Sequence, residues 1–339
     1  MAAALLLWGL LSAFPVPQVR AAEGAPFAVT DDTGFTAHLP GPVSRVIALY
    51  GAFNEILLAL DAGHVLAART SADQSAALAH LPVIGTHMRP NAELVAAARP
   101  DVVLQMAGRE EARLQAGNLR TLGMTVLTFE MNSFAQLFAV TETLGRLAGR
   151  EERAAELVRG WRERLARLDA LYGDRPRVRV FFEARYPNLL GAGRGGIASE
   201  IIARAGGENV LTEAQKLVRC SEEALLAADP DAYVVQIGPM NPAPPPPASR
   251  AHYKGLRAVR TGRVLMVPED MYSRPGPRAL DAAEELGRWL HPQEAEYAPA
   301  ARLAERILPG AGGIFWGHGL RKQENMFSGG RIRPQGSSE

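Results

Sequence analysis

Arginine, tyrosine and histidine side chains follow the short apolar segments of this sequence at several places. Tyr50 comes directly after RVIAL, and His87, Met88 and Arg89 come directly after VIGT. A guanidinium group pairs with carboxylate or catecholate oxygens and keeps its charge in a partly dry cleft. Tyrosine adds a flat apolar surface with a polar end. Such residues after several strands predict a site for a large anionic ligand.

The predicted ligand-binding residues come from both halves of the chain, because residues just beyond the strands of an open α/β sheet face its ligand. They are Tyr50, His87, Met88, Arg89 and Arg109 from the first half, and Glu183, Arg185, Tyr186, Arg194, Met240, Tyr272 and Arg274 from the second. Gln105, Asn241 and residues 130–132 occupy similar positions. Arg278, inside a predicted helix, is expected to be a surface charge.

Several of these residues also have a purely structural interpretation. His87 is compatible with a turn in which its side chain binds backbone groups, and Arg185 with an ion pair to Glu183. Methionines such as Met88 and Met240 more often fill gaps in a core than bind a metal. The seven histidines are scattered singly, without HxH or HxxxH spacing, so no bare-metal site is expected.

The elements that must position these residues alternate between strand and helix patterns. Apolar runs and helical stretches alternate from residue 45 to 130, residues 133–172 are almost continuously helical in pattern, and the alternation restarts after Pro176. The predicted fold is α/β, with two Rossmann-like lobes of mostly parallel sheets joined by one long backbone helix. The expected boundaries are 43–132 for the N-terminal lobe, 133–175 for the linking helices and 176–292 for the C-terminal lobe.

One helix–strand phrase occurs twice, 130 positions apart. PNAELVAAARPDVVLQ spans residues 90–105, and CSEEALLAADPDAYVVQ spans residues 220–236. In each copy Asn91 or Ser221 is placed to cap a helix, and a Pro-Asp pair ends that helix before an apolar strand. Aligned without a gap, Glu93 falls on Glu223. The repeat favours two similar lobes over a solenoid, whose repeats recur every few tens of residues.

The chain of 339 residues has room for two domains. Its 37 basic and 36 acidic residues are nearly balanced, so there is no excess of positive charge that would indicate binding to nucleic acid or to an anionic membrane. Residues 1–22 contain an apolar run followed by small residues, which predicts a signal peptide cleaved near Ala21 or Ala22. No Lys or Arg precedes that run, so the true start codon is open. The Gly-rich tail at 293–339 is expected to be partly disordered.

This order of features resembles the periplasmic binding proteins of ABC importers for iron chelates, haem and cobalamin. RVIALYGAFNEILLALDAGHVLAA is similar to that family's opening strand and helix, and NAELVAAARPDVVL and SEEALLAADPDAYVV are similar to one signature in each lobe. The resemblance covers roughly Val43 to Pro292. It implies lobes joined by a helix, with little closure on ligand, and a monomer free in the periplasm. Cys220 lies outside the signal region and is therefore no lipid-attachment site.

The resemblance also implies a partner, the permease dimer of an ABC importer. Glu93 and Glu223 are the residues expected to dock, one on each lobe, with Glu222 as a substitute for Glu223. A carboxylate in the first turn of a helix is stabilised by the helix dipole and can be bound bidentately by arginine.

The expected ligand is a metal chelate, either a ferric siderophore or haem, and no cofactor is expected. For haem, His87, Tyr50 or Tyr186 would bind iron, and Arg89, Arg185 or Arg274 would bind propionates. Cobalamin and an oxyanion such as molybdate or tungstate are alternative ligands. No catalysis is expected, because GxSxG, Walker, Cys-cluster and HExxH patterns are missing. Two rival hypotheses are a metallocluster or chelatase-like enzyme on the same fold and a binding protein that works without a permease.

Overall fold

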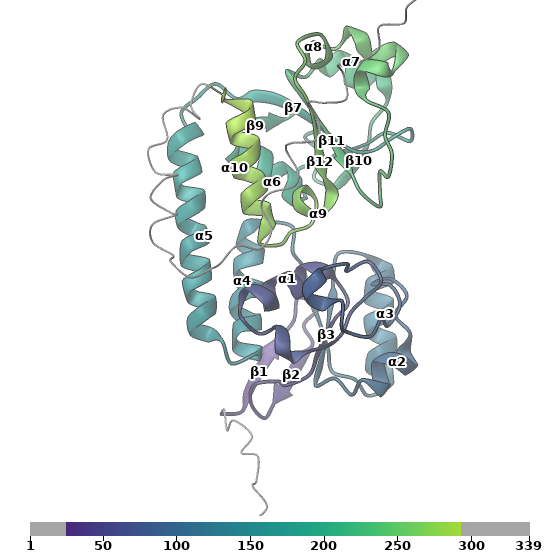
Figure 1. The fold of residues 1–339 in the computed structure, drawn as a ribbon, viewed down its shortest axis with the longest axis vertical. Helices are drawn as coiled ribbons and strands as arrows, with labels where there is room; N and C mark the ends of the chain where they lie inside the picture. Colours follow the sequence, from purple (N-terminus) through teal and green to yellow (C-terminus); the bar gives the residue numbers. More distant parts are fainter. Residues whose placement is uncertain (1–24, 293–339) are drawn as a thin grey trace, which may run out of the picture. The chain divides into compact units, whose positions relative to one another are not determined.

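A computed structural model describes residues 25–292 (Figure 1). The sheet of the first lobe consists of four parallel strands. Their order is β4-β3-β5-β6, with bounds β3 (Val46–Ala48), β4 (Leu66–Ala68), β5 (Val102–Met106) and β6 (Val126–Phe129). Nearly every strand residue is buried, as expected for a parallel sheet with helices on both faces. The accompanying helices and turns are α1 (Gly51–Ala59), η1 (Gly63–Val65), η2 (Ala76–Leu78), α2 (Ala92–Ala97) and α3 (Glu110–Thr121).

The second sheet is mixed. Its order is β10-β8-β7-β11-β12, with β9 paired to β7 off this path. Strands β7, β9, β11 and β12 pair in parallel, whereas β8 and β10 are antiparallel. The strands are β7 (Val178–Arg185), β8 (Leu190–Ala192), β9 (Gly207–Asn209), β10 (Leu217–Arg219), β11 (Ala232–Ile237) and β12 (Val264–Pro268). The helices and turns are α6 (Ile197–Arg204), α7 (Glu222–Ala228), η3 (Pro247–Ser249), η4 (Ala251–Gly255), α8 (Arg257–Arg260), α9 (Glu269–Tyr272) and α10 (Arg278–Leu290).

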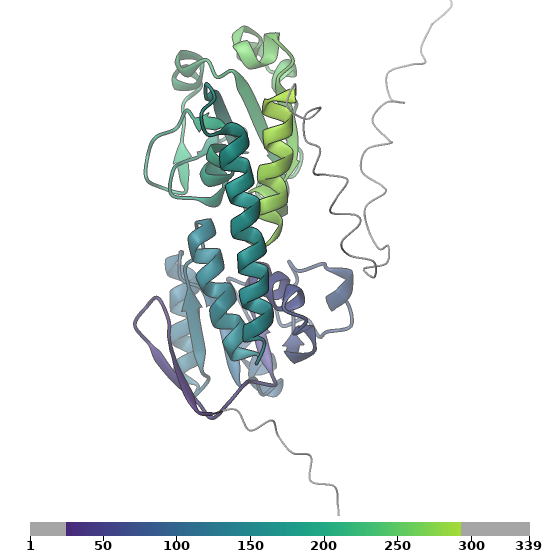
Figure 2. The same ribbon diagram turned by 90° about the vertical axis from the view of Figure 1, so that its left-hand side faces the viewer.

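Two helices connect the sheets, α4 (Phe134–Leu147) and α5 (Glu151–Tyr172). The helical stretch expected from 133 to 172 is thus interrupted around Gly149, whose φ of 63° favours glycine. At 1.5 Å per residue, the 22 residues of α5 extend over about 33 Å. Figure 2 shows α5 alongside α10, and Arg164 of α5 pairs with Asp281 and Glu284 of α10. The predicted fold class, two α/β lobes with mostly parallel sheets joined by a long helix, is confirmed.

The predicted signal peptide at 1–22 and the tail at 293–339 lie outside the described residues. Within residues 25–292, no helix is long and apolar enough to cross a membrane.

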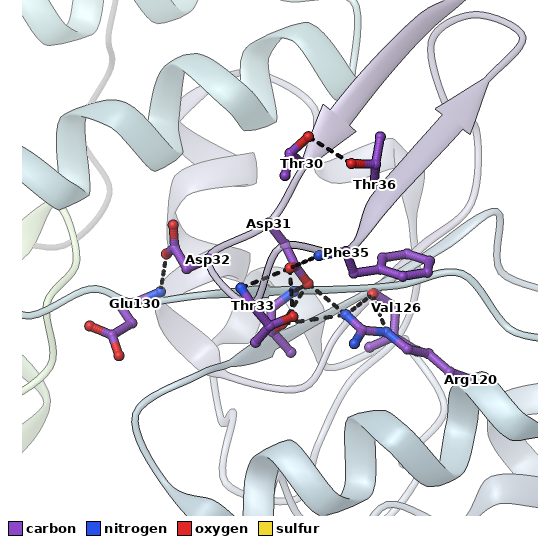
Figure 3. A network of polar contacts seen from close by, with 10 residues as sticks. Thr30, Asp31, Asp32, Thr33, Phe35, Thr36, Arg120, Val126 and Glu130 are labelled. Atoms are coloured by element: carbon purple, nitrogen blue, oxygen red, sulfur yellow. Dashed lines mark hydrogen bonds and ion pairs between the residues drawn. The ribbon is translucent and has the colours of Figure 1, made fainter.

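An antiparallel hairpin that the sequence patterns did not reveal precedes the first lobe. It consists of β1 (Phe27–Thr30) and β2 (Thr36–Leu39), and Asp31 fastens it to the sheet (Figure 3). One carboxylate oxygen accepts from Thr33 and from the backbone of Phe35, and the other accepts from the backbone and hydroxyl of Thr128 and from Arg120 at 2.5 Å. The next residue, Asp32, accepts from the backbone N–H of Glu130 at 2.6 Å. The hairpin therefore fixes the segment that follows β6.

We expect Asp31→Asn to lower the free energy of unfolding by about 2 kcal/mol near neutral pH, because it removes charge-assisted hydrogen bonds from a buried group. Burial by itself raises the pKa of Asp31, but the hydrogen bonds from Thr128 and Thr33 outweigh it and hold the pKa below the ordinary 3.8. This stabilisation is present above the unfolded-state pKa and is lost as the pH falls through the lower native value. Denaturant titration should therefore show that the difference in free energy of unfolding between wild type and Asp31→Asn becomes smaller below about pH 4. A difference that does not change with pH would contradict this role of the ionised Asp31 carboxylate.

Candidate ligand-binding site

Tyr50 and His87 form an aromatic pair beyond the ends of the first sheet. Tyr50 is the N-cap residue of α1, two residues after the end of β3, and its ring meets the His87 ring edge-on at a centroid distance of 6.0 Å. Gln105, buried at the end of β5, donates from Nε2 to the carbonyl oxygen of His87 at 2.9 Å. Both rings remain half-buried. The neighbouring strand end thus holds the long loop that carries His87 beside Tyr50.

Two arginines act electrostatically on this aromatic pair. Burial raises the pKa of Tyr50 to about 12 against the opposing charges of Arg274 and Arg109. Burial, followed by the same two arginines, lowers the pKa of His87 below its ordinary 6.5. Its imidazole is therefore neutral at pH 7 and able to offer a nitrogen lone pair. Arg109 is the N-cap residue of α3, whereas Arg274 comes from the second lobe. The structure thus brings together four predicted residues from both lobes.

Arg274 also takes part in an ion pair between the lobes. Its Nη1 lies 2.9 Å from Oε1 of Glu55 on α1, and Arg278 Nη2 lies 3.0 Å from the same oxygen. Arg278 pairs in addition with Asp270 at 2.9 Å. The interpretation of Arg278 as a plain surface charge is therefore wrong, because it lies across from Glu55 and contributes to the junction of the lobes.

A cavity of about 680 Å³ adjoins this ion pair, at the edge formed by β4 and β12. Residues of both lobes line it, among them Asn54, Glu55, Asp73, Glu269, Arg274 and Arg278. Asn54 donates to Asp73 at 2.6 Å, which fixes the loop after β4 against α1. The volume of this cavity falls within the range of sites that bind small molecules far larger than a simple ion.

Three further predicted residues lie half-buried at strand ends of the second lobe, namely Arg185, Tyr186 and Met240. The guanidinium of Arg250 lies over the Tyr186 ring, with its central carbon 3.8 Å from the centroid. The backbone N–H of Tyr186 donates to the Asn241 side chain at 3.1 Å. The Arg250 guanidinium therefore packs on one face of the Tyr186 ring, a contact that the sequence patterns did not predict.

Glu183 and Tyr272 do not lie where a ligand could touch them. Both are fully buried at 0% exposure. Glu183 accepts from Arg250 at 2.5 and 2.9 Å and from the Tyr233 hydroxyl at 2.6 Å. Tyr272 packs in the core with its ring 6.5 Å from that of Phe182. Their prediction as ligand contacts is corrected, because neighbours from their own lobe surround both side chains. The alternative pairing of Arg185 with Glu183 is also not formed, since Glu183 binds Arg250.

The other predicted residues are more scattered. Arg89 is exposed in a turn in which its backbone N–H donates to Thr86, and Met88 beside it is half-buried. Arg194 is exposed and lines a separate hollow of about 450 Å³ with Arg177, Glu200 and Glu208. Within residues 25–292, no hydrogen bond, ion pair or ring contact joins Arg89 or Arg194 to the side chain of Tyr50 or His87.

The duplicated phrase forms the same structure in both lobes. The side chains of Asn91 and Ser221 cap α2 and α7, and Glu93 and Glu223 are both exposed in the first turn. Glu222 is half-buried and acts electrostatically on Tyr253, so it faces its own lobe. The geometric equivalent of Glu93 is therefore Glu223.

Residues 46–271 match the family model described as periplasmic binding protein. The chain belongs to this family. Such proteins serve ABC importers, so a transporter in the membrane and a small-molecule ligand are its partners. Its relatives are substrate-binding transport proteins and not enzymes.

Named relatives of this periplasmic binding protein differ in what they bind. It is 25% identical to the uncharacterized ABC transporter substrate-binding lipoprotein YvrC of Bacillus subtilis, over 80% of this chain and 87% of the relative. It is 24% identical to the vitamin B12-binding protein of Vibrio cholerae, over 74% and 90%. The crystal structure of a periplasmic heme binding protein from Pseudomonas aeruginosa superposes with a TM-score of 0.62 and 28% identity, covering 74% and 93%.

A second cation of this periplasmic binding protein, besides Arg250, was not predicted from the sequence. Lys216 lies just before β10, half-buried, and a methyl group added at Gly108 of the first lobe would lie 2.5 Å from its Nζ. Lys216 precedes its strand, and β10 is an antiparallel edge strand, so the rule that residues after parallel strands face a ligand does not indicate it. Within residues 25–292, no group of three His, Cys, Asp or Glu side chains is placed to hold a bare metal ion.

Proposed function

We propose that this periplasmic binding protein binds an anionic metal chelate, either a ferric siderophore or haem, and delivers it to an ABC importer. The observation that carries the proposal is the convergence of Tyr50, His87, Arg109 and Arg274 from two lobes. Guanidinium groups that meet at a half-buried aromatic pair favour a flat or bulky ligand with anionic oxygens.

The same group of residues fits iron chemistry. A neutral imidazole is a common ligand of haem iron, and His87 is kept neutral by burial and by its two arginines. For a siderophore, the same arginines would pair with catecholate or carboxylate oxygens, and the rings would pack against the chelate. The adjoining cavity of about 680 Å³ is far larger than molybdate or tungstate requires.

Cobalamin is the second candidate, because the Vibrio cholerae relative is named a vitamin B12-binding protein. Cobalamin is less anionic than haem or a ferric catecholate and leaves the arginines without an obvious role. It is therefore ranked below the anionic chelates.

We further propose that Glu93 and Glu223 dock onto the permease dimer, one glutamate for each subunit. Both are exposed at equivalent positions of α2 and α7. The proposed location is the periplasm, with residues 1–22 as the signal peptide and a mature protein that acts as a monomer. Two similar lobes presenting one carboxylate each suit a partner with two-fold symmetry.

The absorbance spectrum of protein purified from its native host tests the ligand class. We expect either a Soret band, for haem, or a broad charge-transfer band, for a ferric siderophore. Titration of tryptophan fluorescence with haemin, cobalamin, ferric siderophores and molybdate should then give the tightest binding for an anionic iron chelate. His87→Ala should weaken haem binding by about tenfold or more if the imidazole binds iron, and the exposed His252 supplies the matched control, His252→Ala. A corrin spectrum, or a response to molybdate alone, would overturn the chelate proposal.

A further inference from the structure

The glycine-rich segment GAGRGG, residues 191–196, supports the loop that leads to Lys216. Gly193 donates its backbone N–H to the carbonyl oxygen of Lys216 at 3.0 Å, and Arg194 donates its own to Glu213 at 2.7 Å. A methyl group at Gly193 would lie 2.2 Å from the Gln215 oxygen, and one at Gly195 would lie 2.0 Å from the Ala214 oxygen. Only glycine allows this approach. The segment therefore holds residues 213–216 in a fixed position.

Lys216 projects from this fixed loop toward the first lobe. Its Nζ lies against Gly108, at the segment that ends in Arg109. Burial, together with the nearby charge of Arg109, lowers the pKa of Lys216, and Glu130 opposes that shift. Within residues 25–292, neither Lys216 nor Arg109 has a carboxylate within 4.0 Å. A half-buried ammonium and an exposed guanidinium, one from each lobe, thus lie near each other, and within residues 25–292 neither is paired with a carboxylate.

Lysine is rare in this chain, at positions 216, 254 and 322 among 37 basic residues. The order of the strands shows near which sheet edge the Lys216 ammonium lies. Glu130 follows β6, and Lys216 precedes β10, both edge strands, whereas Arg274 and Glu55 lie near the opposite edge formed by β4 and β12. Arg109 acts on Tyr50 and on Lys216, so it connects the two regions. The cations therefore extend along the junction of the lobes, from Arg274 past the aromatic pair to Lys216.

We propose that Lys216, set against Gly108 and beside Arg109, binds a second anionic group of the ligand, on the side of the aromatic pair opposite Arg274. This inference rests on the proposed function, because it assigns an additional contact to the same ligand. The group is a carboxylate or catecholate oxygen, which a lysine ammonium binds as a point charge without demanding bidentate geometry. The ligand is consequently a wide chelate with anionic oxygens at two separated positions.

Probe pairs that differ only or mainly in charge test this assignment on the purified protein. One pair is haemin and its dimethyl ester, and the other is a trianionic ferric tricatecholate and an uncharged ferric trihydroxamate. We expect Lys216→Met to weaken the anionic member by about tenfold and its uncharged partner by less than about twofold. Gly108→Ala should have a similar effect, because the new methyl group displaces the ammonium without removing its charge. Lys254→Met, at an exposed position of η4, is the matched control.

The outcomes separate this inference from the function on which it rests. If an anionic probe binds wild type, Lys216→Met and Lys254→Met equally well, the assignment of Lys216 is wrong and the proposed function stands. Binding of only the uncharged probes overturns both the assignment of Lys216 and the proposal of an anionic ligand, whereas it leaves a metal chelate as the ligand. If wild type binds none of the four probes, both the proposed chelate function and the assignment of Lys216 are wrong.

Discussion

Replacing Glu93 and Glu223 together by alanine is expected to abolish chelate uptake while leaving ligand affinity unchanged. Each carboxylate that is buried against arginine at an interface is worth about 2–5 kcal/mol, so losing both weakens docking by at least about a thousandfold. Either single variant should retain partial uptake, since one lobe still docks. Uptake of labelled chelate by cells that carry the variant as their only copy measures this effect, and fluorescence titration measures affinity.

The control for this variant uses two other glutamates at the start of a helix. Glu151 and Glu152 are exposed in the first turn of α5 and lie outside the duplicated phrase. Their replacement by alanine removes the same charge and the same helix-dipole contribution, about 0.3–1 kcal/mol each. If uptake falls equally in both double variants, docking by Glu93 and Glu223 is refuted and helix stability becomes the explanation.

The repeated phrase has a structural basis that accounts for most of its shared residues, but not for its glutamates. The Asp101 carboxylate accepts from the backbone N–H of Arg45 at 2.8 Å, and that of Asp231 accepts from the backbone N–H of Arg179 at 3.2 Å. Each aspartate therefore fastens the start of its strand to the neighbouring strand. The shared Asn or Ser, Pro and Asp are explained by these contacts and by helix capping. In the described chain neither Glu93 nor Glu223 forms an ion pair, and the Glu223 carboxylate forms only local hydrogen bonds, with its own backbone and Ser221 at the start of α7.

The sequence patterns predicted the fold well, because local rules decide it. Buried parallel strands read as apolar runs, and caps such as Asn91 and Ser221 mark where helices begin. The alternation of helix and strand over each lobe then leaves few topologies. The β1–β2 hairpin was missed because Asp31, which attaches it, binds Thr128 far along the chain.

The site was predicted only in part, because a strand's end indicates the edge of the sheet and not the direction of each side chain. Glu183 falls on a buried position of β7 and meets Arg250, which lies 67 residues later. Tyr272 turns into the core from α9. Lys216 lies before a strand, and only tertiary contacts with GAGRGG bring it to the cleft. Long-range partners decided all three positions.

Arg250→Met is expected to be the most destabilising single substitution at the site, by about 3–5 kcal/mol, because it leaves the Glu183 carboxylate buried without its cation. The Arg250 side chain is 3% exposed and that of Glu183 is 0% exposed, so water cannot replace the lost partner. Denaturant unfolding measures the change. The exposed Arg260 provides the control, since Arg260→Met should change the free energy of unfolding by less than about 0.5 kcal/mol.

Adding Glu183→Gln to Arg250→Met should restore about 2 kcal/mol, because a neutral amide oxygen still accepts from the Tyr233 hydroxyl and no unpaired charge remains. A double variant less stable than Arg250→Met would contradict this account of the buried pair. Ligand affinity gives a separate measurement, because both the single and the double variant lack the guanidinium that packs on the Tyr186 ring. If the Tyr186 ring contacts the chelate, both variants should bind the chelate about three- to tenfold more weakly than wild type.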